Sequence, residues 1–376
     1  MNLSTLYSKH KQENLFGRYI PPEKIEPLLF YYQSKFEIKD IGSSEKGRKI
    51  HSIKLGSGEF KIFIWSQMHG NESTTTKAIF DLIQFLSTKG DLQTQILNHF
   101  TLLIIPMLNP DGSRLYTRVN ANSVDLNRDA KTQTQKESKA LMDSYKSFKP
   151  DLCLNMHDQR TIFSVGDTNK SAIVSFLAPA ADESKTITPA RIFAMQAIAA
   201  IQSILEEFIP GHISRFDDTF NENCIGDTFQ SMQTPTILFE AGHVPGDYQR
   251  EKTREYIFYA LLTLIMHIKD DKVKSLFCED YFKIPESRKN LRDIVISNLS
   301  LPDKAVKTNI GIQFKEILEE DKIELMPFID FISENTNIRG HLEIDASVKN
   351  VLINSTNKIH EGQEVSDLKI NSKKII

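Results

Sequence analysis

Residues 60–73 read FKIFIWSQMHGNES, and they contain the change of pattern on which the fold depends. Residues 60–65 form a short, β-prone apolar run of the kind found in buried strands. Residues 74–86 follow, with apolar side chains at the spacing of one helix face. The pattern therefore predicts a strand, a tight turn and a helix, with His69 and Glu72 at the turn.

The His69 and Glu72 pair lies three residues apart, where a helix begins. Side chains at this spacing can point the same way, so an imidazole and a carboxylate placed here can share one zinc ion. Two plainer interpretations exist for the pair alone. His69 is also compatible with a hydrogen-bonded turn histidine, and Glu72 with a favourable charge in a first helical turn.

Strands and helices alternate along the chain as far as about residue 270, which predicts an α/β fold with a largely parallel sheet. A turn is expected at residues 109–112, and a polar ligand-binding loop at 113–128. The other expected strands are 36–41 and 49–55 (a hairpin), 99–107, 151–157 and 236–240, and the other expected helices are 22–33, 136–146, 188–208 and 250–268.

Length and composition limit the class of protein. The 376 residues are enough for one large α/β domain and a smaller one. A net charge of −3 gives no electrostatic reason to expect nucleic acid or an anionic membrane as a partner. No apolar run approaches the ~18 residues of a spanning helix, and the first residues lack the apolar core of a signal peptide. The 3 cysteines are widely spaced, which favours a soluble, cytoplasmic protein without a disulfide framework.

The texture of the sequence changes after about residue 271. We expect a catalytic domain over 1–270, a helical linker over 271–300 with a helix at 289–299, and a small β-rich domain over 301–376. The last domain suits either oligomerisation, as in a homo-oligomer, or control of substrate access.

Three expected strands end in ionisable residues that a buried strand does not need. They deliver His69 with Glu72, then His157, then Glu240. A catalytic zinc takes three protein ligands, for which two histidines and one carboxylate are a known set, and keeps a fourth position open. A further carboxylate can act as the general base toward water. A salt bridge to a structural arginine is the alternative role for Glu240.

The polar loop adds groups that suit substrate binding. Arg118 could face the oxyanion of a tetrahedral intermediate. Asn127 and Arg128 could bind a carboxylate, the arginine through two parallel hydrogen bonds. Either arginine could instead only stabilise the loop.

Five motifs stand in a characteristic order: HGNE at 69–72, NPDG at 109–112, TRVNANSVDLNR at 117–128, NMH at 155–157 and TILFE at 236–240. This set resembles the zinc carboxypeptidases, the carboxypeptidase A/B-like metallopeptidases. Relatives of that family include murein peptide amidases and the succinylglutamate desuccinylase/aspartoacylase deacylases. The resemblance covers roughly residues 36–270.

The resemblance implies a mixed eight-stranded sheet with helices on both faces, and one zinc ion per chain. In the family, matching positions hold the zinc, supply the base that deprotonates zinc-bound water, polarise the scissile carbonyl and bind the terminal carboxylate of the substrate. In this sequence His69, Glu72 and His157 match the zinc ligands, and Glu240 matches the base. Arg118 matches the residue that polarises the scissile carbonyl, and Asn127 with Arg128 match those that bind the terminal carboxylate.

The sequence thus predicts a zinc-dependent hydrolase of an amide bond next to a terminal carboxylate, foremost a metallocarboxypeptidase acting on peptides. One alternative is a deacylase or peptide amidase that acts on N-acyl amino acids or cell-wall peptides. Another is a non-catalytic protein that holds a carboxylated ligand in the same pocket.

The chain departs from the family pattern in two places. Classical members carry a mobile Tyr upstream of the catalytic Glu, but no Tyr occurs here between Tyr145 and Tyr248. Asp227, within the segment 223–229 that shapes the side-chain pocket of the family, favours a cationic substrate group. Three further polar residues match no family role: Asp158, Arg160 and His243.

Overall fold

The computed structural model describes residues 2–376, which form two compact units. The first unit contains the chain up to Gln159 together with Ala172–Ser287, and the second contains Arg160–Ser171 and Arg288–Ile376. The chain therefore divides after Ser287 rather than at 270 or 300, and a segment from within the catalytic part belongs to the second unit. None of the helices in the described part of the chain has the length and apolar character needed to cross a membrane.

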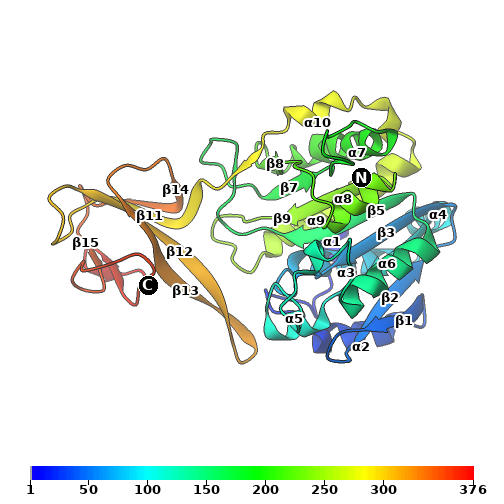
Figure 1. Ribbon diagram of the computed structural model, residues 1–376, viewed down its shortest axis with the longest axis horizontal. Coiled ribbons are helices and arrows are strands. Elements are labelled where there is room, and N and C mark those ends of the chain that lie inside the picture. The colour runs from blue at the N-terminus through cyan, green and yellow to red at the C-terminus, as the bar shows by residue number, and fades with distance from the viewer. Residues whose placement is uncertain (1) are drawn as a thin grey trace. The chain divides into compact units, whose positions relative to one another are not determined.

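The first unit is built on an eight-stranded mixed sheet, which confirms the expected α/β fold (Figure 1). The β3/β4, β3/β5, β5/β9 and β7/β8 pairings are parallel. In their order across the sheet the strands are β1 (Glu37–Ser43), β2 (Lys49–Leu55), β4 (Phe100–Ile105), β3 (Phe60–Ser66), β5 (Leu152–Asp158), β9 (Thr236–Ala241), β7 (Val174–Leu177) and β8 (Ile213–Arg215).

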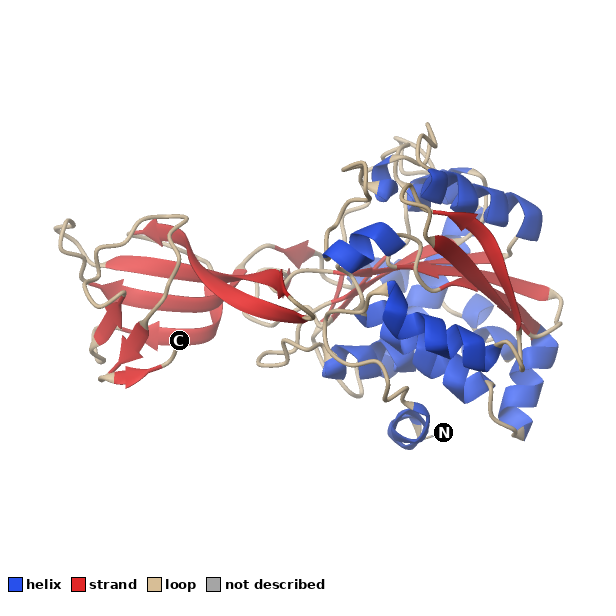
Figure 2. Ribbon diagram, turned by 90° about the horizontal axis from the view of Figure 1, so that it is seen from below, coloured by secondary structure: helices blue, strands red, loops and turns tan. Residues whose placement is uncertain are grey.

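Helices lie on both sides of this sheet (Figure 2). In chain order the helical segments are α1 (Leu3–His10), α2 (Pro22–Tyr32), α3 (Thr74–Leu86), α4 (Asp91–His99), α5 (Pro110–Leu115), η1 (Leu126–Arg128), α6 (Lys136–Phe148), α7 (Pro189–Leu205), α8 (Ile225–Ser231), α9 (Glu251–Lys269), η2 (Val273–Ser275) and α10 (Glu279–Lys283).

Strand β3 shows how the sequence creates two hydrophobic cores. Ile62 and Ile64 enter one core with α3, α7 and α9, whereas Phe63 and Trp65 enter the other with α6 and α8. Successive side chains of a strand point to opposite faces, so a continuous apolar run fits a strand that is covered on both sides. The burial of all four side chains follows from that arrangement.

The expected turn at residues 109–112 is wrong, because α5 begins at Pro110. The Asn109 side chain accepts a hydrogen bond from the Gly112 backbone N–H, so it caps the helix. Proline is favoured at the first helical position, where no backbone N–H is needed. The same residues that predict a turn therefore also satisfy a helix start.

The second unit is a β structure with its own hydrophobic core. The expected helix at 289–299 is wrong, because Leu291–Leu299 forms β11, in which Ile294 and Ile296 are buried. The remaining strands, including two short ones near the division, are β6 (Ser164–Val165), β10 (Ser287–Arg288), β12 (Thr308–Glu319), β13 (Lys322–Ser333), β14 (Arg339–Asp345), β15 (Val351–Ile353), β16 (Leu368–Ile370) and β17 (Lys373–Lys374).

Candidate metal centre

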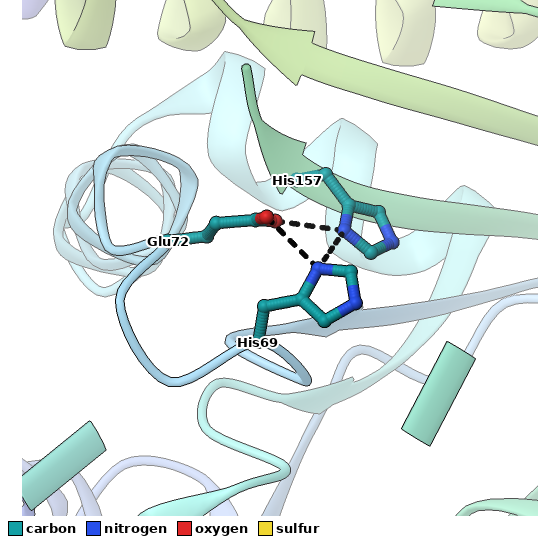
Figure 3. A group of neighbouring side chains, drawn as sticks. All are labelled: His69, Glu72 and His157. Atoms are coloured by element: carbon teal, nitrogen blue, oxygen red, sulfur yellow. Dashed lines mark hydrogen bonds and ion pairs between the residues drawn. The ribbon is translucent and has the colours of Figure 1, made fainter. Parts of the chain in front are cut away.

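His69, Glu72 and His157 meet at the carboxyl edge of the sheet (Figure 3). The turn between β3 and α3 carries the first two, and the end of β5 carries the third. The Nδ1 atom of His69 lies 2.9 Å from Oε1 of Glu72, and Nδ1 of His157 lies 2.8 Å from Oε2 of Glu72. The two Nδ1 atoms are 3.1 Å apart. All three side chains are buried, and one ligand atom from each lies within 4.8 Å of the others.

The turn that presents His69 and Glu72 is held tightly against the start of α5. A Cβ atom on Gly70 would overlap the backbone of Gly112, so only glycine permits this approach. Asn109 Nδ2 also donates to the carbonyl oxygen of Met68 at 3.1 Å. The HGNE and NPDG motifs therefore pack as one unit, although residues 73–108 separate them in the sequence.

The charges of the three residues depend on one another. Burial raises the pKa of Glu72, but the neighbouring His69 and His157 lower it more, so that it lies well below its ordinary value. Burial lowers the pKa of His69, but the combined effect of the Glu72 and Asp125 carboxylates is larger, so the pKa lies above its ordinary value. For His157 burial prevails and lowers the pKa. Glu72 is thus an anion placed between two imidazoles.

Glu240 stands beside this group on the adjacent strand. It is the register partner of His157 in the parallel β5/β9 pair, so both side chains leave the same face of the sheet. Its Oε2 atom is buried and has no hydrogen-bond partner within residues 2–376. Burial, together with the charges of Glu72 and Asp158, raises the pKa of Glu240 well above its ordinary value.

Asp125 is a member of the site that the sequence did not single out. Its Oδ1 atom lies 2.9 Å from Nε2 of His69, on the opposite side of the ring from Nδ1. Its Oδ2 atom accepts from Nε of Arg118 at 3.1 Å, while Nη1 of Arg118 lies 3.2 Å from Oε1 of Glu72. Carboxylates commonly fix the ring of a metal-binding histidine in this way. The local signal for Asp125 in the sequence is its place in the VDLNR motif at 124–128, but that motif was assigned to substrate binding through Asn127 and Arg128.

The predicted substrate-binding residues lie on η1, which carries Asn127 and Arg128, and on α8, which carries Asp227, and side chains of η1 contact the start of α8. Asn127 Oδ1 accepts from the backbone N–H of Ile225 at 3.2 Å. Arg128 is exposed, and its Nη1 atom lies 3.0 Å from Sγ of Cys224. Asp227 is buried in the first turn of α8, and burial raises its pKa to about 7.

The polar residues without a family role fall in separate places. Asp158 is buried directly after His157 and forms an ion pair with Arg18. His243 is buried, with its ring centroid 4.7 Å from that of Tyr248. Arg160 is exposed and belongs to the second unit.

The donor set fits zinc. Imidazole nitrogens and a carboxylate oxygen are common zinc ligands, and two histidines with one glutamate leave a coordination position open, as a catalytic site requires. The anionic Glu72 supplies negative charge that a divalent cation would balance.

Solved structures share the fold of the first unit. A metallo-carboxypeptidase from Burkholderia cenocepacia matches with a TM-score of 0.53 at 16% identity, over 66% of this chain and 69% of that one. Thrombin activatable fibrinolysis inhibitor also gives 0.53, at 15% identity, over 73% of this chain and 81% of that one. At such identities the likeness is one of fold.

Similar sequences are named carboxypeptidases. "Probable carboxypeptidase 2" of Arthroderma benhamiae is 25% identical over 150 residues, which make up 37% of this chain and 27% of that protein. Carboxypeptidase D of Homo sapiens is 26% identical over 159 residues, 37% of this chain and 11% of that one. The matches therefore span about a quarter or less of these relatives' own length.

One family model matches more than half of the chain. It is the model described as zinc carboxypeptidase, and it covers residues 25–233, which include His69, Glu72 and His157 but end before Glu240. The match agrees with the order of motifs, the eight-stranded sheet and the structural neighbours. The chain therefore belongs to the zinc carboxypeptidase family.

Proposed function

We propose that this protein is a zinc-dependent carboxypeptidase that hydrolyses the amide bond next to the terminal carboxylate of a peptide. One observation carries the proposal. The donor atoms of His69, Glu72 and His157 converge beside half-buried Glu240, whose buried Oε2 atom has no hydrogen-bond partner among the described residues. A ligand set next to an unused base is the minimum that hydrolysis at a metal requires.

Zinc would be held by Nδ1 of His69, Nδ1 of His157 and the carboxylate of Glu72. When bound, the ion supplies a Lewis acid that polarises the scissile carbonyl and lowers the pKa of water. Glu240 takes a proton from the attacking water at its carboxylate and later delivers it to the leaving amine. Water thus adds its oxygen to the carbonyl carbon, the carbon–nitrogen bond breaks, and the products are a carboxylic acid and an amine.

Arg118 and Arg128 supply the positive charges toward the substrate. The Arg118 side chain is 48% exposed and already lies beside Glu72, which suits a donor that turns toward the developing oxyanion. The exposed guanidinium of Arg128 would hold the terminal carboxylate, with the Asn127 side chain next to it.

The side-chain pocket would favour a cationic residue at the substrate terminus. Asp227 is buried there, and in the described part of the chain the Oδ1 atom of buried Asn155 has no hydrogen-bond partner. The Cβ position of Gly226 lies 3.8 Å from Asn155 Nδ2, so these groups share one region. Two oxygen acceptors suit the several N–H donors of an ammonium or guanidinium group.

A substrate panel tests the proposal. The zinc-loaded protein would be given peptides that differ only in the last residue, and N-acyl amino acids of similar size. We expect release of the terminal amino acid from peptides, with the highest kcat/KM for terminal Lys or Arg. A higher kcat/KM for N-acyl amino acids would contradict the carboxypeptidase assignment and favour a deacylase.

A further inference from the structure

A short segment near the N-terminus is hydrogen-bonded to the turn that carries the candidate ligands. We call residues 18–20 the N-terminal clasp. Ser73 Oγ donates to the carbonyl oxygen of Arg18 at 2.5 Å. Gln67 Nε2 donates to the carbonyl oxygen of Ile20 at 3.0 Å, and Ser113 Oγ donates to the same oxygen at 2.7 Å. The clasp therefore fixes both ends of the turn that contains His69 and Glu72.

The Arg18 side chain enters the interior behind this turn. Its Nη1 atom lies 2.7 Å from Oδ2 of Asp158 and 2.7 Å from Oγ1 of Thr74. Its Nη2 atom lies 3.4 Å from the carbonyl oxygen of Asn71. The side chains of the ion pair are only 6% and 1% exposed for Arg18 and Asp158, respectively. Removal of one partner from a pair buried to this degree is strongly destabilising, because it leaves an uncompensated buried charge.

Asp158 connects this pair to the candidate ligands. It follows His157 directly, and its carboxylate accepts from the backbone N–H groups of Thr74 at 2.9 Å and Thr75 at 3.3 Å, the first residues of α3. Its own backbone N–H donates to Oε2 of Glu72 at 3.2 Å. One residue thus joins the end of β5, which carries His157, to the start of α3, which directly follows the turn that carries His69 and Glu72.

The clasp also balances charge at the site. The carboxylates of Glu72 and Asp158 belong to neighbouring residues of the site, because the Asp158 backbone N–H donates to Oε2 of Glu72. Arg18 is the buried cation hydrogen-bonded to Asp158. Without it, the Asp158 carboxylate would be an uncompensated buried charge beside the ligands.

We propose that Arg18 is a positioning residue of the metal centre: through Asp158 it holds Glu72 and His157 in the arrangement that binds zinc. The inference rests on the proposed function, because it presumes that these residues bind the metal. Arg18 does not touch the reacting atoms in this account. Its effect is transmitted by the Asp158 backbone N–H and by the capped start of α3.

A second buried pair provides a matched control. Arg254 and Asp81 have fully buried side chains joined at 2.6 Å. Arg254 also donates to the backbone carbonyl oxygens of Gln12 and Leu15, and so holds the same N-terminal segment. These contacts lie outside the turn between β3 and α3. Loss of this pair should lower stability without altering the ligands directly.

The test compares Arg18→Met with Arg254→Met in the full-length chain. Zinc affinity is measured by competition with a chelator, and Co²⁺ replaces zinc so that its visible absorption spectrum reports ligand geometry. We expect Arg18→Met to weaken zinc binding by about 10–100-fold, as loss of supporting partners around a metal site does, and to change the cobalt spectrum. Arg254→Met should lower the unfolding temperature but leave zinc affinity and the cobalt spectrum as in the wild type.

Two further variants keep the inference testable if Arg18→Met does not fold. The double variant with Arg18→Met and Asp158→Asn removes both charges, so it should regain most of the lost zinc affinity. Arg18→Lys keeps the charge but loses the planar fork, so it should fall between wild type and Arg18→Met. Equal losses of zinc affinity in Arg18→Met and Arg254→Met would overturn the inference. It would also be overturned if Arg18→Met, Arg18→Lys and the double variant all showed the zinc affinity and the cobalt spectrum of the wild type.

The outcomes separate this inference from the proposed function. Wild-type protein that binds zinc but releases no amino acid contradicts the function, while the comparison of variants still decides the role of Arg18. Wild-type protein that binds no zinc contradicts both. Normal hydrolysis by the wild type with no special effect of Arg18→Met contradicts the positioning role alone.

Discussion

Glu240 is the residue on which the chemistry of the account depends. Gln has nearly the same shape but cannot take a proton, so Glu240→Gln should lower kcat by about 10²–10⁴-fold, the usual contribution of a general base. Zinc content should not change, because Glu240 is not one of the three converging ligands. Metal analysis and the initial rate of amino acid release measure both effects.

Glu222→Gln is the control for that variant. Glu222 is an exposed carboxylate whose partner is Lys131, so its substitution should leave kcat unchanged. Glu240→Gln protein that retains wild-type kcat would require another base.

If Asp227 binds the substrate as proposed, the substrate preference should depend on pH. Its pKa is raised to about 7 by burial, so the carboxyl is neutral below that pH and charged above it. Only the charged form attracts a cation. The ratio of kcat/KM for peptides ending in Arg to those ending in Leu should therefore rise between about pH 6 and about pH 8, by roughly tenfold for an interaction of about 1.4 kcal/mol. In Asp227→Asn the ratio should stay flat; the same rise in that variant would refute a role for Asp227.

At the scale of single residues, the sequence identifies a site residue when the residues next to it in the chain make its type unexpected. His69, Glu72, His157 and Glu240 each follow an apolar strand, where an ionisable group is unexpected, and the structure brings them together. Arg18 could not be found in this way. It lies in a polar segment without periodicity, and its partner Asp158 is 140 residues away.

The turn between β3 and α3 is the element that sets the geometry of the site. Gly70 packs on the backbone of Gly112, so the added methyl group of Gly70→Ala must push the two segments apart. We expect a loss of about 1–3 kcal/mol in the free energy of unfolding, the usual cost of overpacking. Zinc should bind more weakly too, because Glu72 lies two residues further along. Urea unfolding with and without zinc measures both.

Gly42→Ala is the matched substitution for that experiment. A Cβ atom there meets only the Ala140 methyl group, at 3.0 Å, and Gly42 lies in β1, away from the turn. It should change zinc affinity little. Similar zinc binding in Gly70→Ala and wild type would mean that the approach to Gly112 does not position the ligands.

Long elements with a regular pattern were predictable, and short ones were not. The helix at 74–86 matches α3 residue for residue, since its apolar spacing continues over 13 residues. Strands β7 and β8 have only 4 and 3 residues, and they were not predicted because so short a run shows no hydrophobic periodicity. β11 was predicted as a helix because its apolar residues at 291, 294, 295 and 299 also fit one helix face, although its Ile-Val-Ile centre is typical of a strand.

At the scale of the whole molecule, the second unit is completed by a segment from far earlier in the chain. The carbonyl oxygen of Thr161 lies 2.8 Å from Nε2 of His341, and Leu291 N–H donates to the carbonyl oxygen of Ile162 at 3.1 Å. Asp293 is buried and accepts from the Phe314 backbone N–H at 2.7 Å. The segment Arg160–Ser171 is thus part of the fold of this unit.

Asp293→Ala should loosen this unit. The variant leaves the Phe314 N–H and the Thr161 hydroxyl without their acceptor, which costs roughly 1–3 kcal/mol for a buried donor. Amide hydrogen exchange should become faster in 160–171 and in β12. Asp330→Ala, which removes a partly exposed partner of Arg292, serves as the control and should leave exchange in 160–171 unchanged. Unchanged exchange in Asp293→Ala would show that the segment is held by other contacts.

No pattern in the local sequence predicts that residues 160–171 pair with the second unit. The change of composition after residue 271 indicates a second, β-rich region, and the structure has one. The participation of residues 160–171 depends on contacts that span more than 120 positions, for example Thr161 with Asp293, and pattern reasoning has no access to them. The eight-stranded sheet was predictable only through the order of the family motifs.

The most direct test is a zinc titration of the metal-free protein that follows release of the C-terminal amino acid from a peptide ending in Arg. The account predicts that the rate rises in proportion to added zinc and levels off at about one equivalent per chain, and that His69→Ala shows no such rise. A rate that is independent of zinc, or saturation with zinc without any release of amino acid, would contradict it.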